Sequence, residues 1–293
     1  MTWILLAFSS ALFSAAAAVV QKKTLFELTA LELSFFASIA ILAASSFVPF
    51  FADVTSISRT QALIIVGKSI LGGTAFILVM LSLKHNEISD ALPLLGLTPA
   101  VTALLAAATI HESLQTWEWT GILLMIVGVF IVEKRPNQKI MEAFVTALTS
   151  RNHFYIFGAL LLFALSSVAD KALVGNYRID PLVVLYYQHI VYALLFGVAL
   201  LTQPSSLRAL KDKGRAQFPT IIIIALLTIA YRLTQLEATK DAPVALVLAI
   251  KRTSILFASL VGGRMFSEER LRMRLLGGVL IVVSGFIILR NVG

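Results

Sequence analysis

Residues 243–263 read PVALVLAIKRTSILFASLVGG. Two cations, Lys251 and Arg252, stand near the middle of this run, and every other residue in it is uncharged. A helix needs roughly 20 predominantly apolar residues to cross the hydrocarbon core of a bilayer. The run has that length, so we interpret it as a membrane-spanning helix that carries two charges at depth.

Comparable apolar runs recur along the whole chain. They lie at residues 3–21, 30–51, 61–83, 89–110, 117–132, 154–174, 181–201, 219–236, 243–263 and 275–289. Their length favours helices over strands, because lipid offers no hydrogen-bond partner to an open strand edge. We therefore expect an all-α integral membrane protein with ten transmembrane helices.

The composition agrees with that of a membrane protein. Hydrophobic residues make up 58% of the 293 residues and charged residues 14%, whereas a soluble domain is roughly 45–50% apolar and about 25% charged. The net charge of +8 arises mostly between the apolar runs, where lipid headgroups lie. We therefore expect a lipid bilayer and not nucleic acid as the partner of the basic residues.

Several kinds of chemistry find no support in the sequence. The chain has no cysteine, which excludes disulfides and thiolate metal sites. It also lacks a glycine-rich phosphate-binding loop followed by Lys and Ser or Thr, so any transport would not be driven by nucleotide hydrolysis. We expect no cofactor, no metal and no enzymatic activity.

A polar connection divides the chain nearly in half. We predict a first five-helix repeat at residues 1–135, a polar loop at 136–153 and a second five-helix repeat at 154–293. The ends of the halves match best, because Glu112, Gly121 and Gly128 have the same spacing as Glu269, Gly278 and Gly285. An odd number of helices per repeat requires the two copies to enter the membrane in opposite orientations.

The basic residues also indicate orientation. Lys and Arg concentrate in the connections after the first, third, fifth, seventh and ninth helices. Short loops rich in these residues favour the cytoplasm. We expect both termini outside and the protein in the cell membrane, which is the inner membrane if the source is a Gram-negative bacterium.

With these features the chain resembles the EamA-like permeases of the drug/metabolite transporter superfamily, which have ten helices in two five-helix repeats. The likeness rests on residues 91–99 with Glu112, Gly121 and Gly128, and on residues 244–253 with Glu269, Gly278 and Gly285. This likeness indicates the fold more specifically than it indicates a substrate. One departure stands out, since aligning the repeats puts Lys251-Arg252 of the second opposite Thr98-Pro99 of the first.

Lys251 and Arg252 are the foremost candidates for a site. Both residues lie too deep in the predicted helix for both side chains to extend to the lipid headgroups. A charge at the bilayer centre costs at least about 2.5 to 3.5 kcal/mol on insertion scales. One interpretation is an anion-attracting site between the repeats. The alternative is an internal ion pair, with Asp170 or Glu237 neutralising the two cations.

Other polar residues are placed to line the same cavity, among them Lys68 and Gln235. The predicted substrate-binding set is Lys251, Arg252, Tyr231, Arg232, Gln188, Asp170 and Lys171. Asp170 and Lys171 also fit a local pair near a helix end, and the tyrosines fit ordinary packing. Glu32 is our candidate for proton coupling, with an interfacial carboxylate as the alternative.

Some recurring residues have a structural interpretation instead. Glu112 and Glu269 stand at helix ends, where a carboxylate caps the helix that follows through the positive end of its dipole. The pairs Gly72-Gly73 and Gly262-Gly263 are points of close packing or of helix breaking.

Together these features predict a secondary transporter, an exporter or exchanger, for a small polar or anionic metabolite such as an amino acid. Its cavity would be lined by the first, third and fourth helices and by their counterparts, the sixth, eighth and ninth. Rocking of one repeat against the other would alternate access. The alternatives are a multidrug or cation exporter of the same superfamily, a channel, and a membrane scaffold without transport. The sequence leaves the oligomeric state open.

Overall fold

The computed structural model describes residues 2–85, 93–112, 114–133, 151–202 and 212–266, and a few residues of a C-terminal helix, 279, 280, 283, 284 and 287. At 93, 129–133 and 151–153 it describes the backbone alone. Within these ranges every regular element is a helix. The predicted all-α class is confirmed for the described part of the chain.

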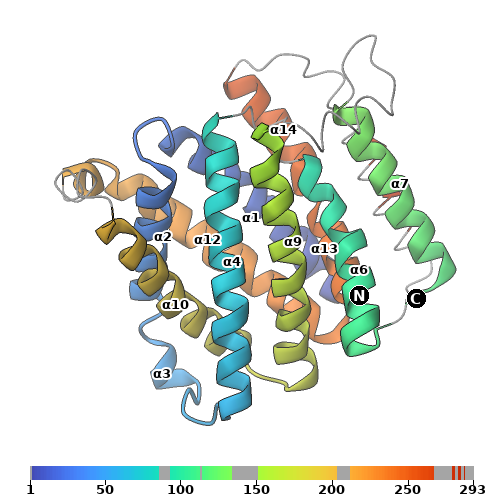
Figure 1. Ribbon diagram of the computed structural model, residues 1–293, viewed down its shortest axis with the longest axis horizontal. Helices are drawn as coiled ribbons and strands as arrows, with labels where there is room; N and C mark the ends of the chain where they lie inside the picture. Colours follow the sequence, from blue (N-terminus) through green and yellow to red (C-terminus); the bar gives the residue numbers. More distant parts are fainter. Residues whose placement is uncertain are drawn as a thin grey trace.

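The first half contains long helices joined by short turns (Figure 1). Its elements are α1 (Thr2–Thr24), α2 (Ala30–Ala44), α3 (Val48–Phe51), α4 (Arg59–His85), the 3-10 turn η1 (Pro93–Leu97), α6 (Thr98–Ile110) and α7 (Thr116–Glu133). Thr29 starts α2 through a capping box, because its hydroxyl accepts the N–H of Glu32 and the Glu32 carboxylate accepts the N–H of Thr29.

The second half follows a similar order of elements. These are α9 (Arg151–Lys171), the π-helical turn η2 (Ala172–Asn176), α10 (Pro181–Leu201), α12 (Phe218–Asp241), α13 (Val244–Lys251) and α14 (Ser254–Met265). Asp180 caps α10 by accepting the N–H of Leu182, and Pro181 occupies the first turn, where its missing N–H costs nothing.

Among the described residues, seven helices are long and apolar enough to cross a membrane. The apolar helix Leu94–Ile110 is shorter, and α7 covers the predicted segment 117–132. The predicted segment 275–289 lies largely outside the described residues, as do residues 89–92 of segment 89–110. The exact count of ten helices therefore stays a prediction.

Two predicted helices are interrupted. Residues 45–47 form a turn between α2 and α3 within the segment 30–51. In the segment 243–263, α13 ends at Lys251 and α14 begins at Ser254. The turn between them keeps backbone hydrogen bonds of the tighter kind, such as the one from Ile255 N–H to the Arg252 carbonyl at 3.0 Å.

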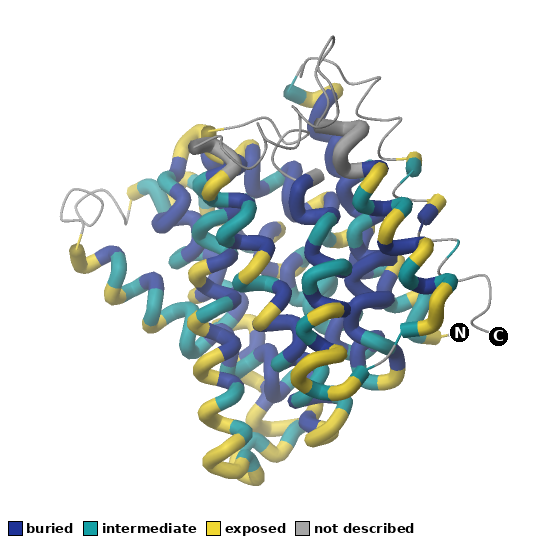
Figure 2. The backbone as a smooth tube through the Cα atoms, turned by 45° about the vertical axis from the view of Figure 1, so that its right-hand side comes forward, coloured by how far each residue is buried: buried dark blue, intermediate teal, exposed yellow. Residues whose placement is uncertain are grey.

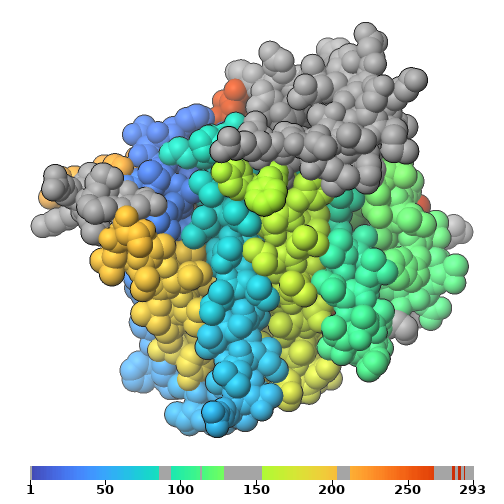
Figure 3. Space-filling view, in the orientation of Figure 1, coloured from blue at the N-terminus to red at the C-terminus, as the bar shows by residue number. Residues whose placement is uncertain are grey.

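The two halves interleave rather than standing side by side. α1 packs against α12 and α4 packs against α9, and these pairs correspond if the halves are matched helix by helix. The same matching relates the contact of α2 with α12 to that of α10 with α4. Figure 3 shows α10, α4, α9, α6 and α7 in this order across one face, so α10 and α9 of the second half alternate with α4 and α6 of the first half.

Apolar and polar side chains have the distribution of a membrane protein. Large hydrophobic side chains are exposed on the outside, for example Phe50, Phe51 and Leu5, and Figure 2 shows exposed residues along the outer sides of the helices. Some charged residues lie inside, including Lys68 and Asp170 at about 2% exposure each. Buried charges of this kind mark functional sites more often than not in membrane helices.

Candidate functional site

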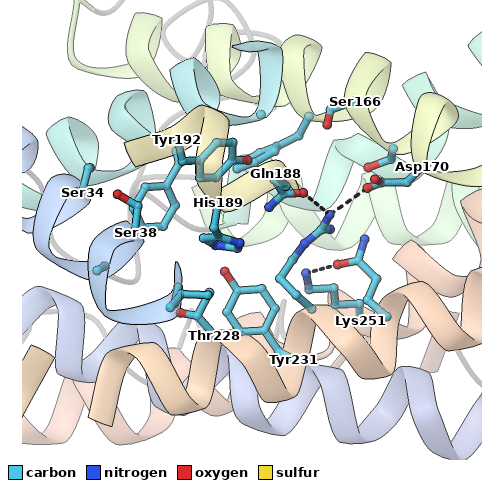
Figure 4. A pocket seen from close by; sticks show the side chains of 18 of the residues that line it. Ser34, Ser38, Ser166, Asp170, Gln188, His189, Tyr192, Thr228, Tyr231 and Lys251 are labelled. Atoms are coloured by element: carbon cyan, nitrogen blue, oxygen red, sulfur yellow. Dashed lines mark hydrogen bonds and ion pairs between the residues drawn. The ribbon is translucent and has the colours of Figure 1, made fainter. Parts of the chain in front are cut away.

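A cavity of about 90 Å³ lies among helices of both halves. Its wall is formed by residues of α2 and α4 from the first half, and of α9, α10, α12 and α13 with Arg252 from the second. Figure 4 shows the polar side chains that point toward it from several of these helices. Of the six helices predicted to line the cavity, those corresponding to α4, α9, α12 and α13 line this one, and α2 and α10 line it in addition.

Asp170 is the centre of a buried charge network. Lys68 Nζ lies 2.7 Å from Asp170 Oδ1, and Arg232 Nη2 lies 3.0 Å from Asp170 Oδ2. Gln188 Oε1 accepts hydrogen bonds from the same two cations. Both carboxylate oxygens are thus occupied by partners on α4 and α12, and Asp170 is not bonded to its neighbour Lys171.

Lys251 and Arg252 both line the cavity although they are consecutive. On an uninterrupted helix consecutive side chains diverge by about 100°, but α13 ends at Lys251 and Arg252 belongs to the turn that follows. Lys251 Nζ donates to Gln235 Oε1 and lies 4.6 Å from the centre of the Tyr231 ring. Arg252 Nη2 donates to Thr98 Oγ1 at 2.9 Å.

The internal ion pair considered for these two cations is absent from the described residues. Asp170 is bound to Lys68 and Arg232, and Glu237 pairs with Lys240 at 2.9 Å. Among the described residues, the hydrogen-bond partners of Lys251 and Arg252 are neutral groups, Gln235 and Thr98.

A second cavity of about 100 Å³ adjoins the first at these cations. The two cavities share part of their walls, namely Phe76, Phe163, Tyr231, Lys251 and Arg252. The second cavity extends between α1, α4 and α14, as far as Gln21 and Leu83 in the last turns of α1 and α4. Two elements that match the predicted first and fourth helices, α1 and η1, form part of the wall of this second cavity.

Tyr231 and Gln188 lie on the wall of the first cavity. Tyr231 presents its ring face to the Lys251 ammonium, an arrangement in which the ring quadrupole attracts the cation. Ser10 on α1 donates to the Tyr231 carbonyl at 2.8 Å, which ties α12 to α1 at this level.

Lys171 is not part of either cavity wall. Its ammonium donates to the carbonyls of Thr239 and Ala242 at 3.0 and 2.9 Å, and lies 3.7 Å from Glu112 Oε1. These are the contacts of a cation that satisfies the last carbonyls of α12. The structure separates Lys171 from the other predicted site residues.

Glu112 caps a helix, but not the one expected. Its Oε2 accepts the N–H of Val244 at 3.0 Å, so it caps α13 of the second half, while α7 is capped by Glu118, whose carboxylate accepts the N–H of Gln115. The interpretation of Glu112 as the cap of the helix that follows it in sequence was wrong, because α7 carries its own cap. Burial raises the pKa of the Glu112 carboxyl above its usual value. Glu269 lies outside the described residues.

Glu32 also lies outside both cavity walls. Its carboxylate is fully buried, belongs to the capping box of α2 and is 2.9 Å from Lys213 Nζ. Lys213 itself is 37% exposed. The carboxylate therefore joins the start of α2 to the segment that precedes α12.

Several residues of the cavity wall were not among the predicted site residues, chiefly Ser34, Ser38, Tyr192 and Thr228. A spacing of four places two side chains on one helix face, and both the Ser34–Ser38 pair and the Gln188–Tyr192 pair have it. This four-residue spacing is the sequence feature that indicates that the members of each pair share a helix face. Gly72 lets Tyr192 approach, because a Cβ added at Gly72 would lie 2.5 Å from the tyrosine oxygen.

The fold and the site define a class of protein: a multi-pass helical membrane protein with a buried, charged cavity between two halves. Comparison with known proteins narrows this class. The sequence model of the EamA-like transporter family matches residues 1–133 and 151–290, and the chain belongs to this family of membrane transporters.

A search of curated proteins returns no match. Among solved structures, one described as "Crystal structure of protein" superposes with a TM-score of 0.71 over 97% of this chain and 95% of that one, at 15% sequence identity. At this identity the likeness concerns the fold alone.

Proposed function

We propose that this chain is a secondary transporter, an exporter or exchanger in the cell membrane, for a small polar or anionic metabolite. The observation that carries the proposal is the pair of cations, Lys251 and Arg252, on the wall between two cavities that helices of both halves enclose. A cationic, largely water-excluded wall attracts anions more strongly than the same charges would in water.

The remaining cavity residues have distinct proposed roles. Tyr231 holds Lys251 against its ring and shapes the pocket, and Gln188 does so from α10. Asp170 keeps Arg232 and Lys68 in place, since both bind its carboxylate. Lys171 contributes indirectly by fixing the end of α12.

Alternating access between two inverted repeats is the proposed mechanism. The pairwise correspondence of contacts, α1 with α12 and α4 with α9, supports a two-fold relationship between the halves. The odd number of predicted helices in each half supports the opposite orientation. Rocking of one half against the other would expose the shared wall at Lys251 first to one side and then to the other.

The contacts suggest which side is closed in this conformation. The second cavity extends toward the ends of α1 and α4, which the distribution of basic residues assigns to the cytoplasm. At the opposite side Glu112 of the first half is bonded to the start of α13 in the second half. Opening toward that side would require this contact to break.

Proton coupling through Glu32 is part of the proposal. Protonation of the carboxylate would weaken its pair with Lys213 and so release the segment before α12. The Glu32→Gln variant tests this role against a purely structural one. A coupling role predicts loss of transport driven by a pH gradient with intact substrate exchange, whereas loss of folded protein alone would assign Glu32 to capping.

A multidrug or cation exporter is less well supported. In the described residues four cations lie in or directly beside the cavity, Lys68, Arg232, Lys251 and Arg252, against one carboxylate, Asp170. Such a site repels a cationic drug.

Counterflow in proteoliposomes tests the proposed function. A transporter gives saturable flux that is accelerated by substrate on the opposite side, and Lys251→Ala or Arg252→Ala abolishes it without loss of membrane-inserted protein. Arg59→Ala is the matched control, because Arg59 is exposed at the start of α4, away from both cavities. Flux without saturation or counterflow would indicate a channel, and no flux would indicate a scaffold.

A further inference from the structure

Among the residues that the structure describes, cations outnumber carboxylates around the two cavities. Asp170 is the carboxylate on the described wall, and its two oxygens are taken by Lys68 and Arg232. Two carboxylates near these helices pair with other cations, Glu112 with Lys171 and Glu237 with Lys240. Within the described residues, Lys251 and Arg252 therefore have no carboxylate partner.

In the described part of the chain, the two cations contact neutral polar and aromatic groups. Lys251 is only 9% exposed, and its contacts are an amide oxygen and an aromatic ring. Arg252 donates to the Thr98 hydroxyl, and its Nε is buried without an acceptor in the described part of the chain. Neutral partners reduce the cost of burying a charge but leave its field in place.

The position of the two cations directs that field into the cavities. Lys251 and Arg252 belong to the walls of both cavities, and the break between α13 and α14 turns both side chains to the same space. Volumes of about 90 and 100 Å³ suit a small molecule rather than an extended one. The serine and tyrosine hydroxyls at Ser34, Ser38 and Tyr192 add polar contacts further along the first cavity.

We infer that the substrate carries two negative charges close together, as a dicarboxylate or a phosphate monoester does, and that Lys251 and Arg252 each take one of them. This inference rests on the proposed transport function and sharpens it. A zwitterionic amino acid or a monocarboxylate would leave one buried cation without a counter-charge, so such a compound binds more weakly.

The experiment compares ligands of different charge on the whole protein reconstituted in liposomes. Counterflow is measured for succinate, malate and glycerol 3-phosphate as dianions, and for lactate and alanine as singly charged and zwitterionic controls. Thermal denaturation of the purified protein with each compound gives a readout that does not depend on transport. We expect at least one dianion to be exchanged about tenfold faster than lactate and alanine, which is the lower end for a charge-assisted hydrogen bond.

Charge-reducing variants make the test specific. Lys251→Gln and Arg252→Gln keep a polar side chain but remove one cation, and each should shift the preference from dianion toward lactate by about tenfold. Arg59→Gln, at the exposed start of α4, should leave the preference unchanged.

The possible failures are distinguishable. If lactate or alanine is exchanged and stabilises the protein as well as the dianions do, the charge inference is overturned while the transport function stands. If no compound is exchanged and none stabilises the protein, both the inference and the proposed function are overturned. The relative success of succinate and glycerol 3-phosphate distinguishes carboxylate from phosphate chemistry.

Discussion

Arg252 Nη2 donates a hydrogen bond of 2.9 Å to Thr98 Oγ1 across 154 positions of sequence. The alignment of the two repeats sets Lys251 opposite Thr98 and Arg252 opposite Pro99, so the bond joins residues one position from equivalence in the two repeats. The two repeats are therefore in contact at a position where their charges differ. A two-fold related pair of helices brings such positions together near its axis.

Replacing Thr98 tests the importance of this contact. Thr98→Val keeps the shape of the side chain but removes the acceptor, and a hydrogen bond to a charged group is worth about 1.5 to 3 kcal/mol. We expect transport efficiency to fall by about tenfold or more. Thr98→Ser retains the hydroxyl and should stay close to the parent. Equal transport by the valine and serine variants would show that Arg252 does not depend on this bond.

Removing the central carboxylate should unfold the site. Asp170→Asn leaves Lys68 and Arg232 buried without a counter-charge, and breaking a buried ion pair from one side costs about 3 to 5 kcal/mol. We expect a marked drop in the temperature of denaturation in detergent. Asp241→Asn is the matched control, because its pair with Arg178 is 67–69% exposed and surface pairs contribute little. A similar loss in both variants would contradict the role assigned to the network.

Gly72 is expected to be needed for space rather than for flexibility. A Cβ at this position would lie 2.5 Å from the Tyr192 oxygen, and overpacking of this kind costs about 1 to 3 kcal/mol. Gly72→Ala should lower thermal stability and disturb transport. Gly67→Ala is the control on the same helix, because nothing lies within 4 Å of the added carbon. Combining Gly72→Ala with Tyr192→Phe removes the clashing oxygen and should restore much of the loss.

Glu112 is expected to act as an acceptor more than as a charge. Glu112→Ala leaves the N–H of Val244 without its partner, and loss of a helix cap costs about 0.5 to 2 kcal/mol. Glu112→Gln keeps an acceptor oxygen and should cost less. Thermal denaturation of both variants distinguishes the two roles, and a larger loss for glutamine than for alanine would refute this assignment.

The raised pKa of Glu112 sets the sign of a pH dependence. Burial raises this pKa above the usual value of 4.5, so the folded protein holds the proton more tightly than the unfolded chain does. Stability from this group is therefore greatest at low pH and falls as the pH rises from about 4.5 through the folded pKa. Denaturation measured across this range should show the fall in the parent and not in Glu112→Gln.

Much of the fold followed from the sequence alone. Apolar runs of spanning length gave helices at nearly the predicted bounds, as in α10, where segment 181–201 and the helix coincide. Hydrophobicity over twenty residues is a local property, and lipid permits few alternatives to a helix. The deep charges at Lys251 and Arg252 could be predicted for the same reason, because a cation within an apolar run is also a local feature of the sequence.

What the sequence could not decide is which distant residue each charge meets. Asp170 lies beside Lys171 in the chain but pairs with Lys68 and Arg232, and Glu112 caps α13 instead of the nearer α7. Such choices depend on how helices pack across the two halves, which no local pattern encodes. Composition and length determined a helical membrane protein with buried cations. Tertiary packing alone decided that Lys251 and Arg252 have no carboxylate partner in the described residues, because the nearby carboxylates of Asp170 and Glu237 pair with other cations.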